Sequence, residues 1–180
     1  MPEKLDYLTP TLMTILYHFL ENPNQEYHER EVIRITKVSK GSANTILRKL
    51  AKNRLLIRQD RGKMAFYRLN TQNPVTRQLK ILANIQSLTP LLEKLKEHTQ
   101  RVTLFGSCAE GNDTATSDID LLIITDQTKT TKKTISDYNN THTRKISQIT
   151  VDPNQYSRLK KEDPALHENI QRGITLWQKT

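Results

Sequence analysis

The sequence predicts an α+β protein of two small domains joined by a helical linker. First, apolar residues recur at helical spacing in three short segments between residues 9 and 53, and residues 55–69 then alternate like a hairpin. Second, residues 75–98 repeat leucine and isoleucine at spacings of mainly three and four. Third, a short apolar strand begins at Val102. We therefore expect domains at residues 1–72 and 99–180 and a linker at residues 73–98.

The positive charge of the chain is concentrated in one segment. The formal net charge of the 180 residues is +9, while the segment from Arg30 to Arg68 holds twelve Lys and Arg against two acids, Glu31 and Asp60. That segment carries +10, so the rest of the chain sums to −1. Such a cluster is typical of a surface that neutralises phosphates, and double-stranded DNA is the expected partner. A solvated basic face is the alternative.

Composition also restricts the compartment. The longest strongly apolar run, Leu121 to Ile124, is far shorter than the ~20 residues of a membrane helix. The segment from Met1 to Lys4 lacks the apolar stretch of a secretory signal. Cys108 is the single cysteine, so neither a disulfide nor a cysteine metal cluster can form within one chain. We expect a cytoplasmic protein with no membrane partner.

The first domain begins with three predicted helices. Thr9 is expected to cap the first of them, with Pro10 as its first residue, and Ser39 is expected to cap the third. The expected helices cover residues 9–21, 28–36 and 39–53. Two short helices joined by a tight turn are the geometry that lets a helix enter the major groove of DNA.

The third helix presents a polar and basic outer face. Its side chains are of the types that contact base edges and phosphates: Lys40, Ser42, Asn44, Thr45, Arg48 and Lys49. After this helix the chain forms a predicted hairpin, whose turn at Asp60-Arg61-Gly62-Lys63 has a basic tip. We expect both features to contact DNA.

Residues 9–70 resemble the winged helix-turn-helix domains of bacterial and archaeal transcription regulators. The segments that carry the resemblance are Ser39-Lys40-Gly41-Ser42, Leu47-Arg48-Lys49-Leu50 and Tyr67-Arg68-Leu69-Asn70. The resemblance implies that the third helix reads the major groove and that Arg61 and Lys63 contact phosphates. A winged helix used for protein contacts is the alternative.

The linker carries an apolar stripe from Leu79 to Leu95. Because proline removes a helical hydrogen bond, we expect a break near Thr89-Pro90 or two short helices. The stripe can pack within the chain, or against the same stripe of a second chain in a homodimer that matches two DNA half-sites.

The second domain combines a Gly-Ser turn with paired carboxylates. The strand from Val102 to Phe105 ends in Gly106-Ser107, and Asp118 is the eleventh residue after Ser107. Asp118 and Asp120 stand one residue apart on a predicted strand, so they project to the same face. Two aligned carboxylates can hold Mg²⁺, and a glycine turn lets the backbone approach a phosphate.

These residues resemble the polymerase-beta-like nucleotidyltransferases, in the form of the minimal nucleotidyltransferase domains. The resemblance implies a mixed sheet flanked by helices, with Gly106 and Ser107 binding the triphosphate of an NTP and the catalytic residues Asp118 and Asp120 holding Mg²⁺. The segment from Gly173 to Trp177 also resembles the end of regulator and nucleotidyltransferase fusions, chiefly archaeal.

Two departures from this family weaken the expectation of catalysis. Glu110 stands where the family often carries a basic residue, and an acid repels a triphosphate. The family also places a third carboxylate on a later strand, whereas the predicted strand from Lys145 to Val151 contains no acid. Asp152 is the nearest candidate, but Asp152-Pro153 also has the pattern of a helix N-cap. The segment from Thr125 to Lys133 is predicted to be a polar, basic loop.

Three functions fit these observations. The first is a transcription regulator whose nucleotidyltransferase domain binds nucleotide with Mg²⁺ or has lost its chemistry. The second is an active nucleotidyltransferase that moves a nucleoside monophosphate from an NTP to a protein, a nucleic acid or a small molecule. The third is a partner protein in which both domains make protein contacts.

Overall fold

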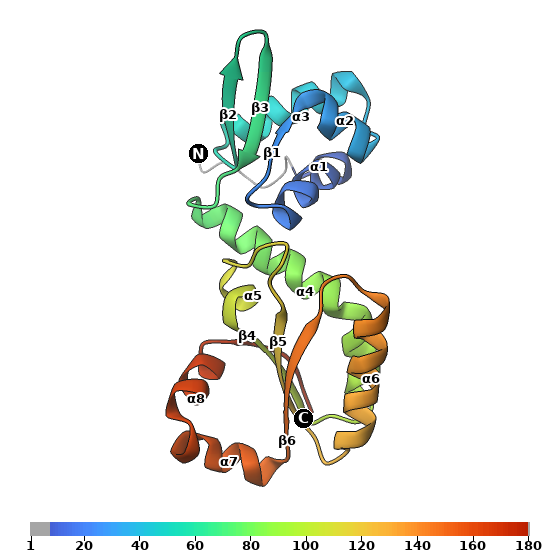
Figure 1. The fold of residues 1–180 in the computed structure, drawn as a ribbon, viewed down its shortest axis with the longest axis vertical. Helices are drawn as coiled ribbons and strands as arrows, with labels where there is room; N and C mark the ends of the chain where they lie inside the picture. Colours follow the sequence, from blue (N-terminus) through green and yellow to red (C-terminus); the bar gives the residue numbers. More distant parts are fainter. Residues whose placement is uncertain (1–7, 180) are drawn as a thin grey trace. The chain divides into compact units, whose positions relative to one another are not determined.

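The computed structural model describes residues 8–179. The chain divides into two compact units, which meet at Leu79 and Lys80 within one helix (Figure 1). None of the helices formed by residues 8–179 has the length and hydropathy needed to cross a membrane.

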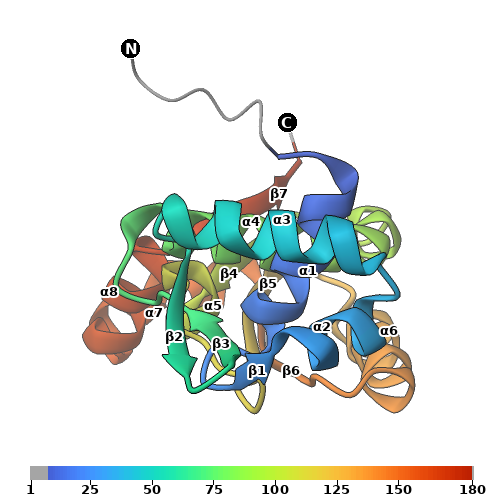
Figure 2. The same ribbon diagram turned by 90° about the horizontal axis from the view of Figure 1, so that it is seen from above.

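The N-terminal unit contains three helices and a three-stranded antiparallel sheet. Its elements are α1 (Pro10–Glu21), β1 (Glu26–His28), α2 (Glu29–Thr36), α3 (Lys40–Lys52), β2 (Leu56–Arg61) and β3 (Met64–Leu69). The strand order is β1-β3-β2. Arg61 pairs with Met64 across a two-residue turn, and this hairpin extends past the helices in Figure 1. Figure 2 shows α3 along its full length.

Local capping explains where these helices begin. The Thr9 side chain accepts a hydrogen bond from the backbone N–H of Leu12 at 3.4 Å, and the Ser39 side chain accepts one from Ser42 at 3.3 Å. The three predicted helices and the hairpin are therefore confirmed. The short strand β1 was not predicted, and it pairs with β3 opposite the segment from Phe66 to Arg68.

The C-terminal unit is built on a four-stranded mixed sheet. The elements of this part of the chain are α4 (Pro74–Lys96), β4 (Arg101–Phe105), α5 (Gly106–Glu110), β5 (Ile119–Ile124), α6 (Thr128–Thr141), β6 (Ile146–Val151), α7 (Pro153–Glu162), α8 (Pro164–Gln171) and β7 (Ile174–Gln178). The strand order is β6-β5-β4-β7. The pair β5 and β6 is parallel, whereas β4 is antiparallel to both of its neighbours, which confirms the predicted mixed sheet.

Helices cover both faces of this sheet (Figure 1). On one face the leucines of α4 and Ile135 of α6 pack against Val102, Leu121 and Ile146. On the other face Ile170 of α8 and residues of α7 pack against Phe105, Leu122 and Ile124. Because side chains alternate along a strand, Asp120 lies on the same face as Leu122 and Ile124.

Two sequence predictions about helices are wrong. The helix α4 continues through Pro90, and only its first residues belong to the N-terminal unit. Thr89 and Pro90 are exposed, so the proline stands on the solvent side while Leu88 and Leu91 are buried beneath it. The predicted loop from Thr125 to Lys133 is a loop only as far as residue 127. Residues 128–133 form the first part of α6, whose Thr131 and Ile135 are buried.

The apolar stripe of α4 packs within the chain along its C-terminal half. Leu88, Leu91, Leu92 and Leu95 all belong to the core of the C-terminal unit. Leu82 is the exposed member, at 46%. Homodimerisation stays a prediction.

Candidate functional site

The turn after β4 brings the backbone against a carboxylate. Gly106 has a φ of +67°, and a Cβ atom at this position would lie 2.6 Å from Oδ2 of Asp120. Any side chain would therefore both strain the backbone and displace the carboxylate. Ser107 follows in the short helix α5, and its side chain is half-buried.

Asp118 and Asp120 lie at the beginning of β5. Asp120 pairs with Phe105 of β4 and with Ser147 of β6, so it stands in the middle of three strands. Asp118 is exposed and directly precedes the strand, whose first residue Ile119 is tied by its N–H to the carbonyl of Lys145 at 2.9 Å. The turn and the two carboxylates thus meet at one end of the sheet.

The electrostatics of this end favour a bound cation. Burial raises the pKa of Asp120, the hydroxyl of Ser147 opposes that shift by hydrogen bonding, and the charge of Asp118 raises the pKa further. Two carboxylates that repel each other are stabilised when a cation lies between them. One or two carboxylates completed by substrate phosphates are a common Mg²⁺ site, and in such a site the ion would neutralise charge on the transferred phosphoryl group. Asp118 and Asp120 fit this donor set.

The third acid that the sequence analysis looked for is not near this pair. Ser147 occupies the position beside Asp120, and the next acid along the chain, Asp152, comes five residues later. At about 3.3 Å per residue, those five residues place Asp152 about 16 Å farther along β6. Among residues 8–179, no group of three or more His, Cys, Asp and Glu side chains is placed to hold a metal ion.

Asp152 has a local structural role instead. Its carboxylate accepts a hydrogen bond from the backbone N–H of Gln155 at 2.8 Å, and its own N–H donates to Oε1 of Gln155 at 3.0 Å. This reciprocal pair is a capping box at the N-terminus of α7, with Pro153 as the first helical residue. Asp152 is therefore a helix cap.

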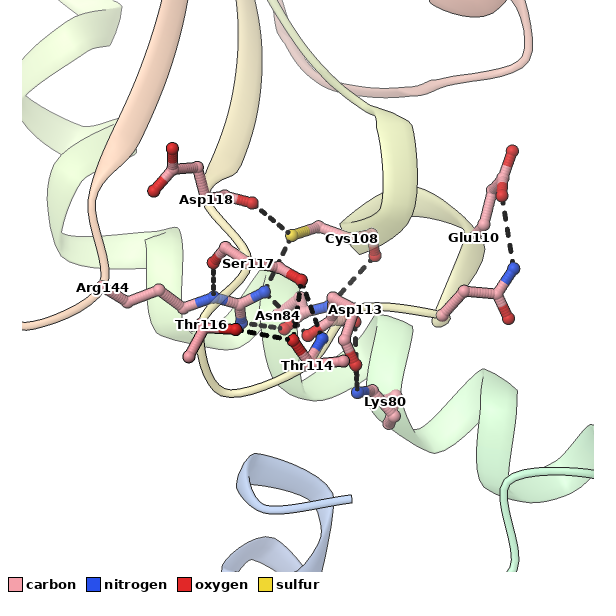
Figure 3. Close-up of polar contacts among 11 residues, drawn as sticks. Lys80, Asn84, Cys108, Glu110, Asp113, Thr114, Thr116, Ser117, Asp118 and Arg144 are labelled. Atoms are coloured by element: carbon pink, nitrogen blue, oxygen red, sulfur yellow. Dashed lines mark hydrogen bonds and ion pairs between the residues drawn. The ribbon is translucent and has the colours of Figure 1, made fainter. Parts of the chain in front are cut away.

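Glu110 is exposed at the end of α5. Its carboxylate accepts a hydrogen bond from the side chain of Asn112 at 3.3 Å. In Figure 3, Glu110 points away from Asp118. It supplies no positive charge to the turn at Gly106.

A buried polar cluster underlies this end of the sheet, and sequence reasoning missed it. Asp113 lies in the loop between α5 and β5, and its side chain is 4% exposed. Its Oδ2 accepts a hydrogen bond from Nη2 of Arg144 at 2.7 Å, and its Oδ1 lies 3.3 Å from Nζ of Lys80 (Figure 3). Nζ of Lys80 also donates to the backbone carbonyl of Asp113.

Asn84 and Cys108 complete the buried cluster. Asn84 donates to Oδ1 of Asp113 and to the carbonyl of Cys108, both at 3.0 Å. Burial raises the pKa of the Cys108 thiol to about 11, and the nearby Arg144 guanidinium opposes this shift. A single acid such as Asp113 in a polar loop has no sequence signal that separates it from a solvated residue.

Most of the predicted DNA-contacting residues of α3 are exposed. Lys40, Ser42, Thr45, Arg48 and Lys49 all have exposed side chains. Asn44 differs, because its side chain donates to Oε2 of Glu29 in α2 at 2.7 Å and is half-buried. This face of α3 therefore carries three cations and two hydroxyls that solvent can reach.

The two hairpin residues differ in their surroundings. Arg61 donates to both carboxylate oxygens of Glu26, at 2.7 and 3.0 Å, and its guanidinium lies 4.7 Å from the ring centre of Phe66. Lys63 is exposed in the turn. Part of the charge of Arg61 is thus already balanced within the chain, whereas Lys63 stands at the tip.

Comparison with protein families decides the family of the C-terminal unit. The family model described as polymerase beta, nucleotidyltransferase matches residues 86–180, which is more than half of the chain. The chain belongs to this family. Its nucleotidyltransferase domain contains the turn at Gly106 and the carboxylates Asp118 and Asp120. Nucleotidyltransferases typically use an NTP and a divalent metal.

Two solved structures are partially similar to this chain. A candidate nucleotidyltransferase from Sulfolobus solfataricus is 16% identical, with a TM-score of 0.39, and the match covers 57% of this chain and 87% of that one. TrmBL2, described as an archaeal chromatin protein with a novel mode of DNA binding, is 14% identical, with a TM-score of 0.34 and coverage of 92% and 72%. No curated protein matches the chain.

Proposed function

We propose that this protein is a DNA-binding transcription regulator whose nucleotidyltransferase domain binds an NTP with Mg²⁺ but does not transfer a nucleoside monophosphate to an acceptor. The observation that carries the proposal is the position of Ser147, which lies beside Asp120 where an acid is needed. A serine hydroxyl does not act as a general base at neutral pH, so Ser147 cannot activate an acceptor hydroxyl as an acid at this position would.

The DNA-binding part of the proposal rests on the N-terminal unit, which we interpret as a winged helix-turn-helix. Residues 1–79 hold fourteen Lys and Arg against seven Asp and Glu, a net charge of +7. In this interpretation α3 enters the major groove, Lys40, Arg48 and Lys49 contact DNA, and Lys63 at the hairpin tip contacts a phosphate. Arg61 contributes less, because Glu26 already pairs with it.

The nucleotide-binding part rests on the end of the sheet. Asp118 and Asp120 supply carboxylate oxygens for the ion, and Gly106 and Ser107 supply a backbone turn and a hydroxyl for the triphosphate. The ion would link the triphosphate to the two carboxylates. Binding of this kind needs neither a third acid nor a general base.

Nucleotide binding and transfer are separated by one pair of measurements. The purified protein is titrated with each NTP in the presence and absence of Mg²⁺, and it is then incubated with each α-labelled NTP and cell extract. Asp120→Asn is the control for both. We expect Mg²⁺-dependent binding by the parent and no transfer of label. Label transferred by the parent but not by Asp120→Asn would establish the second candidate function, an active nucleotidyltransferase, which the intact pair of Asp118 and Asp120 favours.

DNA binding is tested by removing two cations from α3. Arg48→Ala with Lys49→Ala should weaken binding to genomic DNA fragments. The fall of the logarithm of the association constant with the logarithm of the salt concentration should become less steep, by about 2 in slope. Lys132→Ala with Lys133→Ala is the matched control, since it removes the same charge from exposed positions on α6. Equal affinities for the parent and the α3 variant would contradict the assignment of α3 to the DNA contact.

A further inference from the structure

The loop that leads into Asp118 is held from the interior of the domain. This loop, residues 112–118, is polar except for Ala115, and such a sequence is typically solvated and mobile. Here Asp113 turns inward and meets the cations of Lys80 and Arg144. Burial of an acid between two cations fixes the loop at one point, because leaving either charge unpaired in the interior is costly.

Arg144 connects this point to the backbone of Asp118. Its Nε donates to the carbonyl of Ser117 at 2.9 Å, and its Nη2 donates to Asp113 at 2.7 Å. Its Nη1 donates to Oδ1 of Asn84 at 2.9 Å, so all three nitrogens are used. The planar guanidinium holds these partners in fixed directions, which a lysine ammonium cannot do.

The peptide groups on both sides of the Asp118 Cα atom are therefore fixed. Arg144 holds the carbonyl of Ser117, and the thiol of Cys108 donates to the carbonyl of Asp118 itself at 3.3 Å. Nη2 of Arg144 also lies 2.9 Å from the Cys108 sulfur. In Figure 3 the Asp118 carboxylate points away from both groups, so it is left for a ligand.

The backbone next to Arg144 is itself held in place. It precedes β6 by two residues, and the amide side chain of Asn139 in α6 bonds both the N–H and the carbonyl of Ile146, at 2.8 and 3.0 Å. The strand that follows brings Ser147 beside Asp120. One side chain thus links the loop that carries Asp118 to the strand that borders Asp120.

We propose that Arg144 is a positioning residue of the metal and nucleotide site, which sets the direction of the Asp118 carboxylate through the backbone of residues 117 and 118. This inference rests on the proposed binding of an NTP with Mg²⁺ by Asp118 and Asp120. Arg144 does not touch the ligand. Its removal should act on ligand affinity by releasing the loop, as loss of groups that orient metal ligands commonly costs about 10–100-fold in metal affinity.

The test variant is Arg144→Lys, which keeps the positive charge that pairs with Asp113 but loses the planar guanidinium and its several hydrogen bonds. We expect the Kd of the Mg²⁺–NTP complex to rise at least about tenfold, while unfolding followed by the fluorescence of Trp177, the single tryptophan, shows a folded domain. Amide hydrogen exchange should accelerate in residues 112–120 and stay unchanged in β4. Arg172→Lys, which alters an exposed ion pair with Glu168, is the control and should bind like the parent.

Cys108→Ala provides a second variant that leaves the ion pairs intact. It removes one of the two contacts to the backbone of Asp118, so its Kd should rise in the same direction by a smaller factor. If the parent binds the Mg²⁺–NTP complex and both variants bind it as tightly as the parent, the positioning role is overturned and the proposed function stands. If the parent shows no Mg²⁺-dependent binding, the proposed function fails and the positioning role falls with it.

Discussion

The two units of this protein hold equal numbers of cations, but within residues 8–179 only the C-terminal unit places cations in a buried ion-pair cluster. Residues 1–79 and 80–180 each hold fourteen Lys and Arg, but the first unit contains seven Asp and Glu and the second contains twelve. In the N-terminal unit Lys40, Arg48 and Lys63 are exposed on α3 and at the hairpin tip. In the C-terminal unit Lys80 and Arg144 turn inward onto Asp113. Under the proposed function, exposed charge in the N-terminal unit would bind the phosphates of DNA, whereas buried charge in the C-terminal unit supports a loop from the interior.

This difference has an energetic consequence. An exposed ion pair is screened by water and salt and contributes about 0–1 kcal/mol, whereas breaking a buried pair strands a charge and costs about 3–5 kcal/mol. The pair of Arg61 with Glu26 belongs to the first kind, with the arginine side chain 49% exposed. The pair of Lys80 with Asp113 belongs to the second, with both side chains 4% exposed.

Removal of the buried acid should have the largest effect. Asp113→Asn leaves Lys80 and Arg144 without their acid, so the free energy of unfolding of the C-terminal unit should fall by about 3–5 kcal/mol. Fluorescence of Trp177 during urea denaturation measures this, because Trp177 packs against the core of that unit.

Glu26→Gln is the matched control in the N-terminal unit. It also removes the acid from an ion pair, and calorimetry should show a loss of no more than about 1 kcal/mol. Similar losses in the two variants would remove the contrast between the units.

The Cys108 thiol should be protected by its burial. With a pKa of about 11 in the folded protein, the thiolate at pH 8 is scarce, so a disulfide reagent should label Cys108 about a hundredfold more slowly than it labels the urea-unfolded chain. Because the folded pKa lies above the ordinary value of 9.0, the stability linked to this thiol is complete below pH 9 and is lost as the pH rises toward 11. Equal labelling rates in the folded and unfolded protein would contradict this.

Two glycines should respond in opposite directions to the same substitution. Gly106→Ala places a Cβ atom against Asp120 at a positive φ, which should cost about 1–3 kcal/mol and abolish Mg²⁺-dependent nucleotide binding. Gly41→Ala lies in α3, where nothing is within 4 Å of the new atom, and should raise the stability of the N-terminal unit by up to about 1 kcal/mol. Thermal denaturation of both variants provides the measurement.

Loss of a helix cap should have a small effect on stability and none on nucleotide binding. Asp152→Ala removes the capping box of α7 and should cost about 1 kcal/mol. Nucleotide binding should be unchanged, because Asp152 lies far along β6 from Asp120. A variant that folds but no longer binds nucleotide would restore Asp152 as a member of the site.

The elements that sequence analysis predicted well are those that neighbours in the chain define. Thr9 and Ser39 cap the helices that they were expected to cap, and Asp152 caps α7. The turn at Gly106 and the pair of Asp118 and Asp120 also depend on neighbours in the chain, although Asp118 directly precedes β5 and does not belong to it. The family match over residues 86–180 agrees with that pattern.

The elements that it missed depend on distant packing. The first residues of α6 are threonines and lysines with no apolar periodicity, and they are helical because Thr131 and Ile135 are buried. Pro90 stays within α4 because buried leucines on its inner face hold the helix together. The strand β1 exists only through its pairing with β3.

The sequence by itself determined the three helices and the hairpin of the N-terminal unit, the basic segment and the pair of carboxylates, because each depends on residues close together in the chain. Only the tertiary structure decided that Asp152 is a cap, that Ser147 stands beside Asp120, and that Arg144 reaches Asp113 and Asn84 across 31 and 60 residues. Burial and the partners of a charge are set by where the chain folds back on itself, and no local pattern of residue types encodes that position.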